Sequence, residues 1–304
     1  MNVKKADNIM VSVYMLTYNH VKYVEQAIKS VLMQKVNFAY ELLIGDDAST
    51  DGTAEIVKKY AKMYPDIIKA YCRKQNIGAM KNGISIRSKC KGKYIATLEG
   101  DDFWNIDNKL QMQIDFLENH SDYSMCFTDV YLLKKTAESP LVCVKKDINN
   151  MKEYLNNGSD LIGIPTATVI YRNIYRENKD LCSYFTQNAI IGDRIQHTLL
   201  LQYGKLKYLP VKSATYRFIV TKGCSFSAMD EIFRMQETVK ALHVCMNISE
   251  KRCRHLWRKI IANFNKKIFS STLQNKGIIA AVRQIFSDKD IIDTCYLIRK
   301  IISE

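Results

Sequence analysis

A short apolar run that is followed by three closely spaced carboxylates restricts the possible folds of this chain more than any other feature. Residues Tyr94–Leu98 follow Gly92 and are mostly apolar, which is typical of a buried parallel strand. Glu99, Asp101 and Asp102 come directly after them. At about 5 Å and an effective dielectric constant of roughly 20, each pair of these charges costs about 3 kcal/mol. A divalent cation such as Mg²⁺ or Mn²⁺ would remove this repulsion, and a solvated acidic turn is the simpler alternative.

Other segments repeat the order of apolar strand, polar loop and helix. Apolar runs at Val11–Leu16, Glu41–Ile44 and Ile67–Cys72 are each followed by a polar loop and then by apolar residues at helical spacing. A further strand is predicted at Tyr123–Leu133. Four such units in the first half of the chain predict an α/β fold with a doubly wound, mostly parallel sheet flanked by helices.

The polar loops of these units are expected to meet at one edge of the sheet, because parallel strands share their carboxyl edge. Tyr18 follows the first strand, and Asp46 and Asp47 follow the second. These two aspartates could accept hydrogen bonds from a nucleoside base or ribose, although Asp is also common in turns. Lys81 follows the third strand, where it contacts either a phosphate or sugar, or only solvent.

The second half of the chain carries weaker patterns. Ile162–Tyr171 predicts a strand in which Pro165 marks an edge or a turn. Residues 136–157 are poorly patterned and predict an excursion over the surface. Asp193 stands near the start of a predicted helix, where the macrodipole favours an anion. It is either a structural helix cap or, in the functional interpretation, a general base.

The sequence pattern changes near residue 227, so we expect a catalytic domain at 1–227 and a basic amphipathic helical extension at 228–304. Beyond this boundary the pattern is helical without further strands, and basic residues alternate with apolar ones around Trp257. Such helices can lie on an anionic membrane surface. Alternatively, they pack their apolar face on the catalytic domain as a helical cap.

Composition adds limits on partners and location. The 304 residues carry a formal net charge of +14, which favours an anionic partner such as nucleic acid, a membrane surface or a phosphorylated substrate. The nine cysteines have no paired spacing, which is typical of reduced thiols in the cytoplasm. We find no signal peptide and no apolar run long enough to span a bilayer. The expected location is the cytoplasm, with peripheral attachment to the inner face of the cell membrane as an option.

Three of these segments together resemble family 2 glycosyltransferases of the GT-A fold. They are Val11–Asn19, Gly45–Thr53 and Glu99–Trp104, and their order and spacing match as well as their motifs. The resemblance covers roughly residues 9–225 and does not clearly extend to the helical tail. It implies an inverting transfer of a sugar from a nucleotide-sugar, with a UDP-sugar as the first candidate. The acceptor would be a hydroxyl of a cell-surface glycan or of a lipid-linked precursor.

The resemblance also implies which residues bind the donor. Tyr18 and Asp47 would hold the uracil, with Asp46 supporting the loop. Three further residues fall on a family element near the donor, namely Asn76, Lys81 and Asn82.

The remaining implied roles concern the metal and the base. Asp101 and Asp102 match the metal and ribose positions of the family, and Glu99 stands where the common pattern begins with Asp. The implied cofactor is Mn²⁺ or Mg²⁺, and Glu99 and Asp101 would also face the nucleotide-sugar. Asp193 matches the catalytic base. Ile219 stands where many relatives have a histidine that can reach the metal, so this chain lacks that ligand.

Two other classes of protein remain to be weighed. Nucleotidyltransferases that make nucleotide-sugars also combine α/β sheets with metal-binding carboxylates. They usually carry a glycine-rich basic loop after the first strand, whereas Thr17–His20 contains no glycine. A non-enzymatic binder of nucleic acid or of an anionic surface would explain the net charge. Since residues 1–225 show no basic motif interleaved with aromatics, we expect no nucleic-acid partner.

Overall fold

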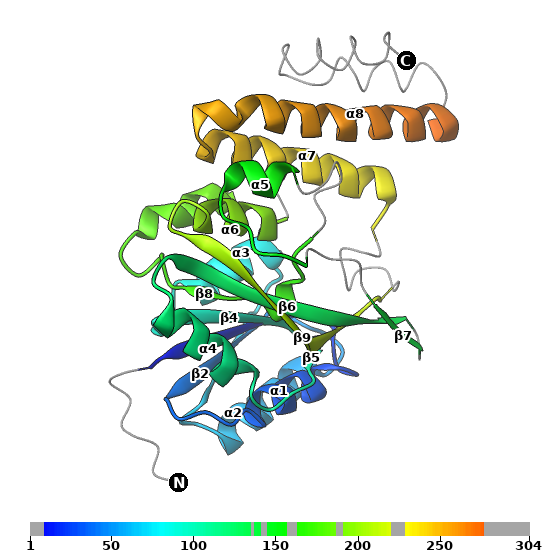
Figure 1. The fold of residues 1–304 in the computed structure, drawn as a ribbon. Helices are drawn as coiled ribbons and strands as arrows, with labels where there is room; N and C mark the ends of the chain where they lie inside the picture. The colour runs from blue at the N-terminus through cyan, green and yellow to red at the C-terminus, as the bar shows by residue number, and fades with distance from the viewer. Residues whose placement is uncertain are drawn as a thin grey trace.

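The fold is a single mixed sheet of nine strands with helices on both faces, seen here in a computed structural model (Figure 1). The strand order is β3-β2-β1-β4-β8-β6-β9-β5, and β7 pairs with β6 outside this path. The structure describes residues 9–134, 137–140, 145–156, 163–186, 191–219 and 229–276. The predicted α/β fold with a mostly parallel sheet flanked by helices is confirmed.

The first half consists of the predicted strand–loop–helix units. Their elements are β1 (Val11–Thr17), α1 (Val24–Leu32), β2 (Tyr40–Asp46), α2 (Thr53–Met63), β3 (Ile68–Cys72), α3 (Ala79–Arg87), β4 (Tyr94–Glu99), β5 (Phe103–Trp104) and α4 (Lys109–Asn119). Strands β1 to β4 run parallel to one another. Their apolar side chains are buried on both faces, which explains why the sequence shows continuous apolar runs and no alternation.

The second half closes the sheet with antiparallel pairs and adds most of the upper helices. Its elements are β6 (Tyr123–Lys134), β7 (Ala137–Pro140), α5 (Met151–Asn156), β8 (Ile170–Arg172), α6 (Asp193–Leu200), β9 (Lys205–Arg217), α7 (Glu231–Ile248) and α8 (Arg254–Lys276). Strand β8 runs antiparallel to both β4 and β6, and β9 returns parallel to β6.

The carboxyl ends of β2, β1 and β4 lie in register. Thr17 of β1 is opposite Asp46 of β2, and Leu16 is opposite Glu99 of β4. Two further backbone bonds continue this alignment into the loops, from Asp47 N–H to the Thr17 carbonyl (3.0 Å) and from Gly100 N–H to the Leu16 carbonyl (2.8 Å). The predicted polar loops therefore do leave one edge of the sheet side by side.

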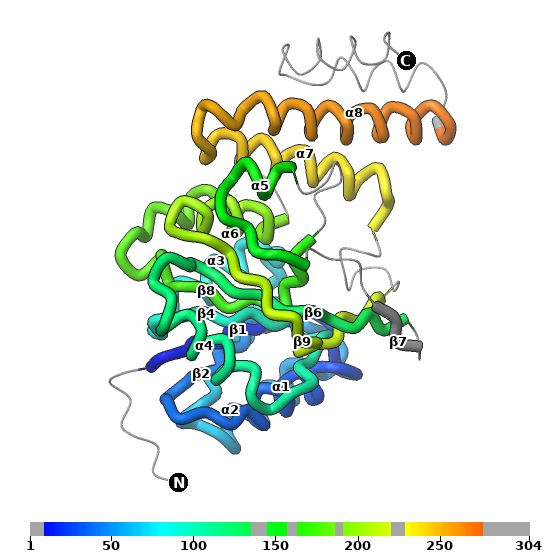
Figure 2. The backbone as a smooth tube through the Cα atoms, in the orientation of Figure 1, coloured from blue at the N-terminus to red at the C-terminus, as the bar shows by residue number. Residues whose placement is uncertain are grey.

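Two hydrophobic clusters lie on the two faces of the sheet. Helices α1 and α2 cover one face, while α3, α5 and α6 cover the other and separate it from α7 and α8 (Figures 1 and 2). Trp257 and Ile261 of α8 are fully buried in the same cluster as Phe127 of β6. The apolar stripe of α8 is thus used for packing, which is the helical-cap alternative of the sequence analysis.

Part of the predicted extension lies outside the described residues. This part includes the expected boundary at 227 and 228, which falls within residues 220–228, and the predicted helix beyond residue 276. Within the described ranges, no helix combines the length and apolar character needed to cross a membrane.

Two local predictions were wrong. In place of the strand expected at Ile162–Tyr171, residues 163–165 have no regular structure, Thr166–Thr168 form a 3₁₀ turn, and the three-residue strand β8 begins only at Ile170. The Thr168 side chain (2.7 Å) and backbone N–H (3.0 Å) both donate to the Pro165 carbonyl, and such a turn competes with strand pairing. The expected surface excursion contains helix α5, whose buried residues Met151, Tyr154 and Leu155 recur at helical spacing.

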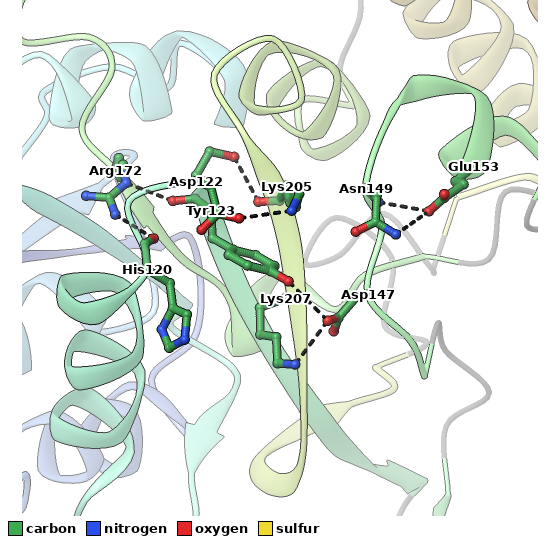
Figure 3. A network of polar contacts seen from close by, with 10 residues as sticks. His120, Asp122, Tyr123, Asp147, Asn149, Glu153, Arg172, Lys205 and Lys207 are labelled. Carbon is green, nitrogen blue, oxygen red and sulfur yellow. Dashed lines mark hydrogen bonds and ion pairs between the residues drawn. The ribbon is translucent and has the colours of Figure 1, made fainter.

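A polar network crosses the amino ends of β6 and β9 (Figure 3). Lys205 pairs with Asp122 (2.9 Å), Lys207 pairs with Asp147 (3.0 Å), and Arg172 donates to carbonyl oxygens at the end of α4. Arg172 is opposite Tyr94, the first residue of β4, so this network lies at the other edge of the sheet from Glu99. We assign it a structural role.

Candidate active site

Three carboxylates form a compact group at the end of β4. Glu99, Asp101 and Asp102 each offer an oxygen within 4.8 Å of the other two. Asp102 is fully buried, and its Oδ1 accepts a hydrogen bond from the Arg217 backbone N–H (2.8 Å). Its Oδ2 is also buried and has no hydrogen-bond partner among the described residues. Leaving such an atom unbonded is costly, so the site is short of one positive or donating partner.

The electrostatics of this group fit a bound divalent cation. Burial, followed by repulsion from Asp101 and Asp193, raises the pKa of Glu99 to about 8. Burial also raises the pKa of Asp101, and burial with repulsion from Asp101 and Glu99 raises the pKa of Asp102 well above its usual range. A divalent cation coordinated by these oxygens would reverse the repulsion and bond the orphaned Oδ2.

The loops after β1 and β2 are joined to each other beside this group. Asp46 accepts hydrogen bonds from the Ser49 N–H and hydroxyl, as expected of an Asp in a turn. Asn19 bonds to the same loop, through its N–H to the Ser49 hydroxyl and through its side chain to the Thr50 N–H. Tyr18, which precedes Asn19 in the loop after β1, is half-buried. Hydrogen bonds between the two loops therefore hold the segment that would support a nucleoside.

Asp47 anchors the third predicted loop. Its two carboxylate oxygens accept hydrogen bonds from the N–H groups of Ile77 (3.0 Å) and Gly78 (2.9 Å). Arg73 lies 3.9 Å from the same carboxylate. Because each carboxylate oxygen has two lone pairs, Asp47 can still accept a bond from a ligand.

The three residues predicted on this loop differ in exposure. Asn76 and Lys81 are exposed, and the Asn76 side chain accepts a bond from the Gly78 N–H. Asn82 is buried, and its amide donates to the Gly45 carbonyl while accepting from Arg73. Asn82 therefore holds the loop from behind, whereas Lys81 is exposed at the start of α3.

Asp193 lies at the first position of α6, and Gly192 occupies the N-cap position. The structural alternative, in which Asp193 caps the helix, is therefore not what the backbone shows. Its Oδ1 accepts from the Arg194 N–H (2.7 Å), and its charge raises the pKa of Glu99. Asp193 is therefore near enough to Glu99 for their charges to interact, while the Ile219 side chain is buried and offers no ligand atom.

Three site residues were not predicted from the sequence. One is Arg73, beside Asp47, and another is Arg217, which contacts the acidic loop at residues 99–102. His20 is buried with Nε2 3.8 Å from Asp101 Oδ2. His20 directly follows Tyr18 and Asn19 of the predicted loop, so its position in the sequence could have identified it as a site residue. Gly100 is required beside it, because a Cβ there would lie 2.6 Å from the Thr17 hydroxyl oxygen.

Comparisons with known proteins agree with this geometry. The family model described as Glycosyl transferase family 2 matches residues 12–178, more than half of the chain. An uncharacterized protein of Mycobacterium tuberculosis is 30% identical over 210 residues, 68% of this chain and 58% of that protein. A putative teichuronic acid biosynthesis glycosyltransferase of Bacillus subtilis is 34% identical over 137 residues, 43% of this chain and 53% of that protein. The chain belongs to glycosyl transferase family 2.

The matches leave part of each relative uncovered, since the chain spans little more than half the length of these two proteins. The family model that matches is described as a glycosyl transferase family, and not as a nucleotidyltransferase family or a family of non-enzymatic binders.

Solved structures share the fold. Staphylococcus aureus TarS, residues 1–349 in complex with UDP-GlcNAc, has a TM-score of 0.66 at 16% identity, covering 94% of this chain and 81% of that chain. The mannosyltransferase PcManGT from Pyrobaculum calidifontis, in complex with GDP-Man and Mn²⁺, has a TM-score of 0.55 at 13% identity, covering 97% and 86%. At these identities the likeness shows the fold alone.

A buried lysine lies behind the acidic loop. Lys109 is fully buried, and its Nζ donates to Gln113 Oε1 (2.6 Å) and lies 4.6 Å from the centre of the Trp104 ring. Burial lowers the pKa of Lys109 to about 7. The unfolded chain therefore binds a proton above this pH that the folded chain does not.

We expect this difference to make stability rise with pH. Between about pH 7 and 9 the unfolded state holds the extra proton, so the free energy of unfolding should increase by about 1 kcal/mol per pH unit from this group. Lys109→Met should lack that increase. Urea unfolding of both proteins at the two pH values measures it, and other titrating groups cancel in the comparison. Parallel pH profiles would show that Lys109 stays charged throughout this range.

Proposed function

We propose that the protein is an inverting glycosyltransferase that uses a UDP-sugar and a divalent cation, Mn²⁺ or Mg²⁺. The observation that supports this most is the convergence of Asp47, the Glu99–Asp102 group and Asp193 at one edge of the sheet. The bases of nucleotides can be read by loop carboxylates such as Asp47, and the acidic group suits a cation shared with a diphosphate. The nucleotide-sugars bound by TarS and PcManGT are consistent with a donor of this class.

The proposed reaction assigns the proton transfer to Asp193. Its carboxylate accepts the proton of the acceptor hydroxyl while the hydroxyl oxygen attacks the anomeric carbon. The attack comes from the face opposite the diphosphate, and the bond from that carbon to the diphosphate oxygen breaks. Asp101 and Asp102, with Glu99 beside them, would hold the cation, which when bound offsets the charge that grows on the leaving diphosphate.

A thermal-shift panel of UDP-, GDP- and dTDP-sugars with Mn²⁺ tests the donor class. A ligand present at 100 times its dissociation constant stabilises the folded protein by about 2.7 kcal/mol, so UDP-sugars should raise the melting temperature most. Stabilisation by GDP- or dTDP-sugars alone would correct the nucleotide. Release of pyrophosphate from a nucleoside triphosphate and a sugar phosphate would contradict the reaction class.

The acceptor class is proposed from the relatives. The name of the Bacillus subtilis relative places that protein in teichuronic acid biosynthesis. We propose that this chain likewise acts on a hydroxyl of a cell-surface glycan or of its lipid-linked precursor. A lipid-linked precursor is held in a membrane, so the same proposal includes a cytoplasmic location with peripheral attachment to the inner face of the cell membrane.

Membrane attachment through α8 would have to be electrostatic in the described part of the helix, because its apolar stripe is buried. Lys259 and Lys267 lie on the exposed face. Since each basic residue near an anionic surface contributes about 1 kcal/mol, reversing both charges to Glu should weaken binding to phosphatidylserine vesicles at least about tenfold. Charge reversal of Lys58 and Lys62 on α2, across the molecule from α8, is the matched control (Figure 1). Equal co-sedimentation of both double variants would remove α8 as the contact.

A further inference from the structure

Arg217, at the end of β9, connects the acidic loop to helix α1. Its backbone N–H donates to Asp102 Oδ1 (2.8 Å), and its Nη1 donates to the backbone carbonyl of Asp101. Its Nη2 donates to Oε1 of Gln26 on α1. Both residues at the centre of the proposed cation site are therefore bonded to the same arginine.

Two aromatic rings hold the guanidinium in place. Its Cζ lies 5.1 Å from the centre of the Tyr23 ring and 4.6 Å from the centre of the Phe103 ring. Tyr23 precedes α1, and Phe103 belongs to β5, which pairs with β9. A planar guanidinium fits between two rings and presents its N–H groups in a fixed fork, whereas a lysine ammonium would do neither.

The charge of Arg217 has two opposing effects on metal binding. It repels the metal, but it also lowers the pKa of Asp101 and Asp102 and so favours the ionised carboxylates that bind a cation. The contacts of Arg217 act in one direction only. They fix the backbone at Asp101 and bind one oxygen of Asp102, while Oδ2 of Asp102 remains unbonded within the described residues.

We propose that Arg217 is a positioning residue for the cation site. Its side chain braces the backbone of Asp101 against α1, and its backbone N–H binds the carboxylate of Asp102, so that both acidic side chains are already arranged for a divalent cation. The inference rests on the proposed function, because it takes the acidic group to be a cation site. Removing a group that orients metal ligands in this way typically lowers the affinity for the metal by about 10- to 100-fold.

Calorimetric titration of the nucleotide-free protein with Mn²⁺ tests this role without an activity assay. Arg217→Met should lower the affinity for Mn²⁺ about tenfold or more. Arg217→Lys keeps the charge but loses the fork and the stacking, so its affinity should also fall about tenfold. If Arg217 acted only through its charge, Arg217→Lys would bind Mn²⁺ as the wild type does.

Lys212→Met is the matched control, because Lys212 is on the same strand and its Nζ also lies over a ring, 4.5 Å from the centre of Tyr131. It should bind Mn²⁺ as the wild type does. Should Arg217→Met fail to fold, Tyr23→Leu removes one side of the aromatic clamp and should lower the affinity in the same direction. Unchanged or tighter Mn²⁺ binding by the Arg217 variants would overturn the positioning role. A wild-type protein that binds no Mn²⁺ would instead reject the cation site of the proposed function.

Discussion

Asp193→Asn is expected to reduce sugar transfer by about 10²- to 10⁴-fold, the usual contribution of a positioned general base. Asn has nearly the same shape and can still accept the hydrogen bond from the Arg194 N–H, so α6 should begin as it does now. It cannot take up the proton of the acceptor hydroxyl. Release of nucleoside diphosphate from the best donor of the thermal-shift panel measures the loss, and donor binding should stay within about threefold of the wild type.

Asp180→Asn is the matched control for this variant, because it makes the same change at an exposed position in the segment before α6. It should transfer sugar at the wild-type rate. Normal turnover by Asp193→Asn would show that another group removes the proton. A loss of donor binding that equals the loss of rate would assign Asp193 to the donor site instead, since uniform binding and transition-state stabilisation separate in this way.

The placement of the polar loops could be predicted because it depends only on local patterns. Each apolar run specifies a buried parallel strand, and parallel strands end at a shared edge. This is why Tyr18, Asp47 and Asp101 could be expected near one another, although the chain separates them by many residues. The register observed between β1, β2 and β4 provides the detail that periodicity does not contain.

The features that were not predicted correctly from the sequence depend on contacts that local patterns do not encode. Arg217 reaches Asp101 only because β9 returns parallel to β6 and then pairs with β5, and no local pattern encodes that strand order. The helix at Met151–Asn156 was missed because its few apolar residues were read against a polar background. The strand at Ile162–Tyr171 was overpredicted because the Thr168 N–H and side chain both bond back to the Pro165 carbonyl and turn the chain. Secondary-structure propensity predicts a segment poorly where a tertiary or side-chain contact determines its conformation.

The affinity of the acidic group for Mn²⁺ should rise with pH, by up to about tenfold per pH unit between pH 6 and 8. Burial and neighbouring charge raise the pKa of Glu99 to about 8, so the metal-free group still holds a proton below that pH. A cation must displace this proton, and the displacement becomes easier as the pH approaches the pKa. Calorimetric titrations with Mn²⁺ across this range, in buffers of different ionisation enthalpy, give both the affinity and the number of protons released.

The same proton links metal binding to stability. Between the ordinary pKa of a glutamate and about 8, the folded metal-free protein binds a proton that the unfolded chain has lost. Its stability should therefore fall as pH rises through this window, and Mn²⁺ should restore it most at the upper end. Glu99→Gln carries no proton to displace, so it should flatten the pH dependence of Mn²⁺ affinity. A wild-type affinity that does not change with pH would mean that the three carboxylates are already ionised without a cation, in which case repulsion alone would keep the site open for one.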